Sequence, residues 1–368
     1  MTDLAFALYW GKEDDTPMRY NPLGPSGAKV SIIGLGTEHC LGANDLAPVV
    51  HAALDHGINY MDVIIWAAKD KNRFAAALRG HRDDVLLAAH IGVAETNGQY
   101  RRTRDPQECE ELWNGWLARL GTDHLDVGHL HYVDQLNDYE QMVAPGGVLE
   151  LAQRLKRQGK VRLLSLSGHN PEVAMRAVED GILDVVMHPI GIGQAFNPRV
   201  TELCELCARR GVAVVVMKTF AGGELLQRER PPSPAQCIHY SLAQPGVATV
   251  LVGPKNVKEL EADLTYLDAS AEEKDYAAAV QEFRGTLQGT CVYCSHCLPC
   301  PAAIDIALVM NLYAAAKKWG VDAAMGSDYA SLPAKASSCV ECGECMERCP
   351  FGVDVIAQMR ETVELFGA

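Results

Sequence analysis

The 368-residue sequence has no run of lysine or arginine and no excess of positive charge. It carries 33 basic and 47 acidic side chains, which gives a formal net charge of −14. Nucleic acids and anionic membranes attract proteins through basic surfaces. The composition therefore argues against either of these as a main partner.

Long apolar segments and a secretion signal are also missing. No stretch approaches the roughly 20 apolar residues of a membrane-spanning helix, and no signal-peptide pattern follows Met1. Together with thirteen cysteines, this predicts a reducing compartment, the cytoplasm. The hydrophobic content of 48% is sufficient for a large core. The length predicts two domains, or one barrel with an appended module.

The cysteines that are present are concentrated in two runs near the C-terminal end. The runs are Cys291, Cys294, Cys297 and Cys300, then Cys339, Cys342, Cys345 and Cys349. Each run ends in Cys-Pro. The second run fits the ferredoxin spacing C-x2-C-x2-C-x3-C-P at every position, and the first is one residue shorter before its last cysteine.

This spacing predicts two [4Fe–4S] clusters with crossed ligands. In two-cluster ferredoxins the first three cysteines of a run hold one cluster, and the cysteine before the proline reaches the other. We therefore predict one cluster on Cys291, Cys294, Cys297 and Cys349, and the other on Cys339, Cys342, Cys345 and Cys300. Zinc is the alternative, because C-x2-C pairs also form zinc sites. Four cysteines in each run, both ending in Cys-Pro, favour iron–sulfur.

The other five cysteines are scattered, and we expect most to be small buried apolar residues. They are Cys40, Cys109, Cys204, Cys207 and Cys237. Cys204 and Cys207 form a further C-x2-C, but it lies in an apparent helix with no second pair nearby. Packing is the expected role of this pair.

From residue 29 a pattern of short apolar runs and amphipathic stretches repeats eight times. The predicted strands are 30–35, 59–63, 85–89, 125–131, 162–166, 183–188, 212–217 and 248–252. Near-continuous apolar strands suit a parallel sheet covered on both faces. Eight βα units over ~250 residues predict an α/β fold of the (β/α)8 TIM-barrel type. We expect an N-terminal extension (1–17), the barrel (18–285) and a small helical ferredoxin-like domain (286–368). Helices are expected at 271–283 and 304–319.

Polar side chains follow most of the predicted strands, where TIM barrels carry their chemistry. Six of the twelve histidines lie at or just past a strand end. The candidates are His39, Asp62, Trp66, His90, His129, His131, His169 and His188. A single histidine in such a place is more often structural, but six around one rim predict a shared pocket. Metal binding by these histidines is a weaker alternative, because only His129-Leu130-His131 forms a local pair.

Glycine-containing loops with a lysine follow the last two strands. They contain Lys218, Gly222 and Gly223 in the first loop, and Gly253 and Lys255 in the second. Barrels commonly hold a phosphate at this place on backbone N–H groups. This suits a nucleotide or a flavin. Ordinary turn chemistry, in which glycine supplies positive φ, is the alternative.

Several segments resemble the aldo-keto reductases, in the subgroup with a C-terminal iron–sulfur module. They are MRYNPLGPSGAKVSIIGLGT, LGTDHLDVGHLH, GKVRLLSLSGHN, VVVMKTFAGG and VLVGPKN, followed by the two cysteine runs. The resemblance extends from about Met18 to the end of the chain. It implies the TIM barrel and the two-cluster module described above.

The resemblance also implies a catalytic set of Asp, Tyr, Lys and His, of which this sequence matches only part. Asp62 and His131 stand at the Asp and His positions. Ala67 stands at the position of the proton-donating Tyr, and His90 at that of the Lys. We expect Asp62, His90 and His131 to be catalytic, with His39, Trp66, His169 and His188 around the substrate. The positions that usually contact the nicotinamide cofactor also differ, with Met187, Gly191 and Asp263 in place of Gln, Asn and Asn.

Three functions remain open from the sequence. The first is an oxidoreductase that reduces a small organic substrate with single electrons from the clusters, supplied by ferredoxin or another one-electron carrier. The second is an NAD(P)H-dependent carbonyl reductase with a substituted acid. The third is a non-catalytic electron-transfer or redox-sensing protein. The first is favoured because hydride transfer carries two electrons at once and does not need clusters.

Overall fold

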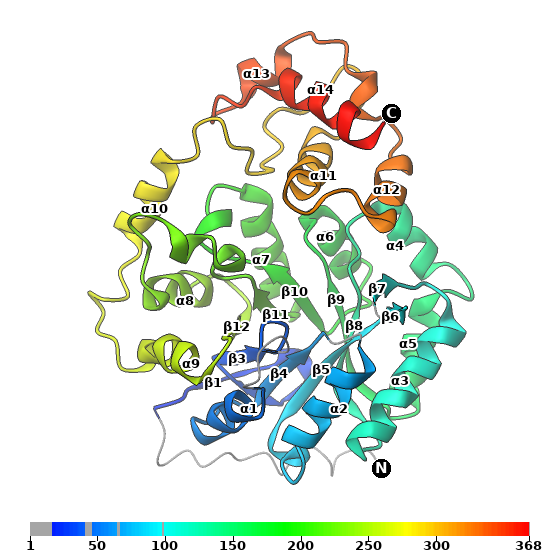
Figure 1. The fold of residues 1–368 in the computed structure, drawn as a ribbon, viewed down its shortest axis with the longest axis vertical. Coiled ribbons are helices and arrows are strands. Elements are labelled where there is room, and N and C mark those ends of the chain that lie inside the picture. Colours follow the sequence, from blue (N-terminus) through cyan, green and yellow to red (C-terminus); the bar gives the residue numbers. More distant parts are fainter. Residues whose placement is uncertain (1–16, 41–45, 65–66, 98, 368) are drawn as a thin grey trace. The chain divides into compact units, whose positions relative to one another are not determined.

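The computed structural model describes residues 17–40, 46–64, 67–97 and 99–367. Eight parallel strands close into a barrel, with helices between successive strands (Figure 1). The strands are β3 (Ile33–Gly36), β4 (Tyr60–Val63), β5 (Leu86–Ile91), β8 (Leu125–Leu130), β9 (Val161–Ser167), β10 (Val185–Pro189), β11 (Ala213–Met217) and β12 (Val247–Val252). The expected TIM-type barrel is therefore confirmed.

The first predicted strand, 30–35, is wrong in one respect, because it covers two strands. Residues Lys29–Ser31 form β2, which pairs antiparallel with β1 (Tyr20–Pro22) in a hairpin outside the barrel. Only β3 joins the barrel. The apolar run is continuous across both strands, so periodicity alone gave no sign of the break at Ile32.

Helices cover the outer face of the barrel. They include α1 (Leu46–Asp55), α2 (Ala68–Ala77), α3 (Pro106–Leu120), α4 (Leu136–Val143), α5 (Val148–Arg157), α6 (Pro171–Glu179), α7 (Pro198–Arg210), α8 (Pro234–Leu242) and α9 (Val257–Leu264). Side-chain caps define several starts. Asp105, for example, accepts from the backbone N–H of Gln107 at the beginning of α3, which satisfies a donor that the helix itself cannot pair.

Alternation along each strand divides the core into two layers. Val186 and Val214 belong to the large layer between strands and helices. Tyr60, Ala88 and Val127 belong to a smaller cluster that fills the lower barrel interior. The interior-facing positions further along these same strands are polar, and they form the site described below.

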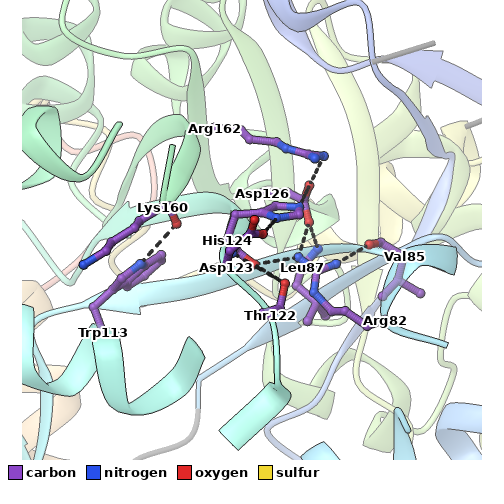
Figure 2. A network of polar contacts seen from close by, with 10 residues as sticks. All are labelled: Arg82, Val85, Leu87, Trp113, Thr122, Asp123, His124, Asp126, Lys160 and Arg162. Atoms are coloured by element: carbon purple, nitrogen blue, oxygen red, sulfur yellow. Dashed lines mark hydrogen bonds and ion pairs between the residues drawn. The ribbon is translucent and has the colours of Figure 1, made fainter. Parts of the chain in front are cut away.

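Asp126 anchors the opposite, N-terminal end of the barrel (Figure 2). Its carboxylate accepts hydrogen bonds from Arg82 at 3.1 Å, Arg162 at 2.9 Å and the backbone N–H of Leu87 at 2.8 Å. These partners tie the beginnings of β5, β8 and β9 together. We assign this buried carboxylate a structural role, because the active sites of TIM barrels lie at the other end of the barrel.

A second compact unit contains residues 277–368 together with the segment 193–199. Its helices are α10 (Ala277–Gly285), α11 (Ile306–Trp319), α12 (Ala323–Ala330), α13 (Glu344–Arg348) and α14 (Val355–Phe366). Its core includes Val309, Met310 and Met359. The helix expected at 271–283 begins later, at Ala277, and residues 271–274 form turns. The helix expected at 304–319 is α11.

Within the described residues, none of the helices has the length and apolar character needed to cross a membrane.

Candidate active site

The polar centre of the barrel comes from positions that continue the inner face of three neighbouring strands. Asp62 follows Tyr60 by two residues on β4, His90 follows Ala88 on β5, and His129 follows Val127 on β8. In the parallel register His90 lies beside His129, and His129 lies beside Ser165 of β9. Because side chains two residues apart point to the same face, these groups meet inside the barrel.

A continuous chain of hydrogen bonds runs from this centre to the rim. The Nε2 atom of His90 lies 3.1 Å from Oδ1 of Asp62. The Nδ1 atoms of His90 and His131 lie 2.9 Å apart, and the hydroxyl of Tyr100 lies 2.7 Å from Nε2 of His131. The structure thus brings the three expected catalytic residues together, and adds Tyr100.

Only the last member of this chain is exposed. Tyr100 is 39% exposed, whereas Asp62 and His131 are each 3% exposed and His90 is 7% exposed. The hairpin that carries Tyr100 consists of β6 (Val93–Thr96) and β7 (Gln99–Arg102), and it follows β5 directly. Sequence reasoning missed this hairpin. Its signal was the Asn97-Gly98 pair, a common two-residue hairpin turn, in which Asn97 has φ of 54°.

Gly92 lets the chain leave β5 and enter the hairpin. Its φ is +106°, and a Cβ at this position would lie 2.9 Å from the backbone oxygen of Thr103, which is too close for a side chain to fit. The backbone N–H of Thr103 donates to the oxygen of Gly92 at 2.9 Å. A residue with a side chain would therefore disturb the position of Tyr100.

Burial and neighbouring charges determine the protonation states of Asp62 and His131. Burial alone would raise the pKa of Asp62, but His90 and His129 lower it, so the pKa stays well below its usual range. Burial lowers the pKa of His131 well below the ordinary histidine value, and the charges of His90, Arg104 and Arg102 lower it further. Asp62 is therefore an anion that accepts hydrogen bonds, and His131 is neutral near pH 7.

His129 extends the centre on the side away from Tyr100. Its Nδ1 lies 2.8 Å from the hydroxyl of Ser165, and its buried Nε2, 3.4 Å from Oδ1 of Asp62, makes no hydrogen bond. Asp62, His90 and His129 each offer a ligand atom within 4.8 Å of the others, as a metal site requires. The direct Asp62–His90 hydrogen bond pairs two of these atoms with each other.

A second polar group lies at the ends of β8, β9 and β11. Nδ1 of His169 lies 3.0 Å from the carboxylate of Asp134, and the ammonium of Lys218 lies 2.9 Å from Nε2 of His169. Burial opposes ionisation of Asp134, but the His169 side chain and backbone N–H hold its pKa below the usual value. Because Asp134 accepts from Nδ1, Nε2 of His169 is the acceptor that faces Lys218.

Gly168 makes room for this second group. A Cβ at Gly168 would lie 2.7 Å from the backbone oxygen of Val133 and 2.8 Å from Oδ1 of Asp134. Two residues expected in different roles, His169 at the substrate and Lys218 at the cofactor, are in direct contact. Lys218 itself has φ of 56°, a strained conformation that often occurs at functional sites.

Two other candidates, His188 and His39, take no part in the hydrogen bonds of these two groups, although the charges of His169 and Asp134 act on His188. His188 is buried, and Met187, not His188, belongs to the inner cluster of the barrel; burial lowers the pKa of His188 to about 3. His39 is exposed, and its ring lies against Gly253, where a Cβ would be 2.9 Å from Cδ2 of the ring. Trp66 is outside the described residues.

The two glycine loops differ in what they offer to a phosphate. Gly222 and Gly223 have φ of +68° and +91° and lie on the short 3₁₀ turn η4 (Ala221–Gly223). In the other loop the backbone N–H of Lys255 donates to the carboxylate of Glu259 at 2.8 Å. A phosphate on this N–H group would have to displace a negatively charged side chain.

Cysteines line two hollows in the second unit. One hollow is bordered by Cys291, Cys294, Cys297 and Cys349. The other is bordered by Cys297, Cys300, Cys339, Cys342 and Cys345. Apolar side chains, including Phe351 in the first and Met359 in the second, complete the walls. Thiolates in an apolar, water-poor setting suit iron–sulfur clusters.

The remaining cysteines lie in the barrel unit. Cys204 and Cys207 are fully buried on α7, and burial raises the pKa of each to about 12. Neutral, inaccessible thiols of this kind are packing residues. Cys40, Cys109 and Cys237 are buried as well.

Comparisons with known proteins agree with this arrangement. Residues 33–237 match the aldo/keto reductase family, and residues 288–353 match a 4Fe-4S dicluster domain. An uncharacterized oxidoreductase of Bacillus subtilis is 24% identical over 305 residues, which cover 72% of this chain and 96% of that protein. The L-galactose dehydrogenase of Arabidopsis thaliana is 24% identical over 309 residues, which cover 72% of this chain and 94% of the relative.

A solved structure supports the fold. The holo form of an aldo-keto reductase from Bacillus halodurans superimposes with a TM-score of 0.60 at 24% identity, covering 72% of this chain and 96% of the other. The family match spans more than half of the 368 residues. The chain therefore belongs to the aldo/keto reductase family, and it is an oxidoreductase that carries a 4Fe-4S dicluster domain.

Proposed function

We propose that the protein reduces a small organic substrate at the mouth of the barrel, using electrons delivered one at a time. The observation that carries the proposal is that one chain combines two cysteine-lined hollows with a hydrogen-bonded acid–base set in its barrel. When bound, [4Fe–4S] clusters supply single electrons. A ferredoxin or a similar one-electron carrier is the natural donor to such a module.

The cysteines bordering the hollows suggest the ligand sets. We propose that Cys291, Cys294, Cys297 and Cys349 hold one cluster, and that Cys339, Cys342, Cys345 and Cys300 hold the other. The sulfur atoms within each set come from both cysteine runs, as in two-cluster ferredoxins. Cys297 borders both hollows, and its position in the first run assigns it to the first set.

In the barrel, Asp62, His90 and His131 act as the acid–base set. The ionised Asp62 orients His90 and compensates for any positive charge on it. The cationic Lys218, held by His169, stabilises negative charge that develops on the substrate oxygen. A carbonyl compound is the substrate class that uses both an acid and a nearby cation during reduction.

NAD(P)H-dependent carbonyl reduction is the second candidate, favoured by the similarity to L-galactose dehydrogenase. Two features of the chain count against it. Glu259 occupies the backbone N–H of Lys255, where a phosphate would bind. Asp263 stands where an adenine-contacting Asn is often found, and burial raises its pKa to about 7.

Anaerobic purification followed by two titrations distinguishes the candidates. We expect about eight irons per chain, as two [4Fe–4S] clusters require. We expect the visible absorbance of the clusters to bleach with reduced ferredoxin, and not with NADPH or NADH. Reoxidation by an aldehyde such as glyceraldehyde then tests for turnover. Bleaching by NADPH would favour the second candidate, and fewer than four irons would contradict the proposal.

A further inference from the structure

We infer that Tyr100 is the group that donates a proton to the substrate, and that His90 supplies this proton through His131. The inference rests on the proposed function for its substrate. It assigns a role to a tyrosine on a surface hairpin, 31 residues from His131 in the sequence.

The first argument is access. His131 and His90 are buried, so a substrate cannot reach their ring nitrogens without a rearrangement of the barrel. Tyr100 is exposed, and its hydroxyl contacts Nε2 of His131 at 2.7 Å. Among the residues joined by this chain of hydrogen bonds, Tyr100 is the one that a substrate can touch.

The second argument is the direction of the hydrogen bonds when the histidines are neutral. The carboxylate of Asp62 can only accept, so His90 donates from Nε2 and accepts at Nδ1. His131 must then donate from Nδ1 and accept at Nε2. Tyr100 therefore donates its hydroxyl hydrogen inward to His131, and it holds no hydrogen toward the substrate.

One added proton on His90 reverses the direction of the hydrogen bonds that join His90, His131 and Tyr100. His90 then donates from both ring nitrogens, toward Asp62 and toward Nδ1 of His131. His131 in turn donates from Nε2 to the oxygen of Tyr100, and the tyrosine hydroxyl then donates outward. The carboxylate of Asp62, 3.1 Å away, compensates for the positive charge on His90.

The proton balance closes in one cycle. The Tyr100 O–H bond breaks and its proton goes to the carbonyl oxygen of the substrate. Tyr100 recovers a proton from Nε2 of His131, His131 recovers one at Nδ1 from His90, and His90 ends neutral. Two equivalents of a reduced one-electron carrier supply the two electrons, one each, and the second proton, which goes to the substrate carbon, comes from water. His90 is reloaded through the same hydrogen bonds in the opposite direction, with Tyr100 taking up the proton from solvent.

The hairpin holds Tyr100 firmly enough for this role. Glu95, which is paired with Tyr100 across the hairpin, accepts a hydrogen bond from the first backbone N–H of α2 at Ala68. Arg101 forms an ion pair with Glu108 of α3. The titratable and charged groups around Tyr100 are His131, which directly follows β8, Glu95 from β6 and three arginines: Arg101, Arg102 and Arg104.

This reversal of hydrogen-bond direction can be tested without a substrate. We would replace Tyr100 by 3-fluorotyrosine in the cluster-loaded, oxidised protein and follow its ¹⁹F resonance against pH. We expect one step, because the Tyr100 hydroxyl changes from donating inward to donating outward when the hydrogen bonds reverse. The step should disappear in both His90→Gln and His131→Gln, and persist in His124→Gln, at the other end of the barrel. Fluorotyrosine in place of Tyr20 should show no step.

Absence of the step, or a step that survives both His90→Gln and His131→Gln, would overturn the inference. Either variant suffices if the other fails to fold. Turnover of glyceraldehyde with reduced ferredoxin provides the second test. Tyr100→Phe should lower kcat by about 100-fold or more, and Tyr20→Phe should leave it unchanged. An inactive wild type would contradict the proposed function, whereas an active Tyr100→Phe would contradict only the role of Tyr100.

Discussion

The Nδ1 atoms of His131 and His90 lie 2.9 Å apart, so one imidazole must donate the hydrogen that the other accepts. Two histidines in this relationship cannot choose their tautomers independently. Because Asp62 fixes His90 and Tyr100 contacts His131, one protonation event at the buried end changes the hydrogen bonding at the exposed end. This coupling gives the barrel a way to deliver protons without admitting water to its centre.

Substitution of two buried aspartates at opposite ends of the barrel should have different effects, one on turnover and the other on stability. We expect Asp62→Asn to lower turnover by about 100-fold, because the amide cannot compensate for a protonated His90. Asp126→Asn removes the carboxylate that pairs with Arg82 and Arg162, and should lower the free energy of unfolding by about 3 kcal/mol. Turnover per folded molecule of the Asp126 variant should equal that of the wild type.

The two measurements are steady-state turnover and urea unfolding. A larger loss of turnover in Asp126→Asn than in Asp62→Asn, at equal folded fraction, would contradict this division of roles.

Pairs of cysteine substitutions should reveal which cysteines share a cluster. Cys291→Ala and Cys349→Ala should each leave about four irons per chain, and the double variant should also leave about four, because both residues serve one cluster. Cys300→Ala with Cys349→Ala should leave almost none. Iron and sulfide analysis after anaerobic purification measures this. If each run held its own cluster, the Cys291/Cys349 double variant would lose nearly all of its iron.

The buried His188 should make the barrel less stable at mildly acidic pH. Burial and the charge of His169 together lower its pKa to about 3 in the folded protein, against the opposing effect of Asp134. The unfolded chain binds a proton there below about pH 6.5, so the unfolded state is favoured as pH falls. Between pH 7.5 and 5.5 this residue should reduce the free energy of unfolding by about 1.4 kcal/mol.

Comparison of the wild type with His188→Gln isolates this contribution. Between pH 7.5 and 5.5, the free energy of unfolding of the variant should fall by about 1.4 kcal/mol less than that of the wild type. His129 and His131 contribute to the fall in both proteins. Urea unfolding followed by the fluorescence of Trp113 and Trp116, in a background in which Trp10, Trp66 and Trp319 are each replaced by Phe, reports the barrel. An equal loss in both proteins would rule out this titration.

Much of the barrel could be predicted from local patterns. All eight barrel strands overlap predicted apolar runs. The exception at 30–35 arose because β2 and β3 are both apolar. The late start of α10 had a similar cause, since residues 271–276 have helical composition but form turns and coil.

The site could be predicted only in part. Asp62, His90 and His131 were identified by resemblance and by their places at strand ends, and the structure joins them. Tyr100 was not identified, because neither its type nor its position in the sequence relates it to His131. The contact depends on the hairpin, on the turn at Gly92 and on the closure of β5 against β8.

The sequence by itself determined the eight-unit barrel and the two-cluster cysteine module. Both are encoded in short segments, through the alternation of apolar residues and the spacing of ligands, so no distant contact is needed to detect them. Only the tertiary structure decided which polar side chains meet. Parallel register places His90 beside His129, and hairpin geometry places Tyr100 on His131. Such contacts depend on how separate strands align in space, which no local pattern specifies.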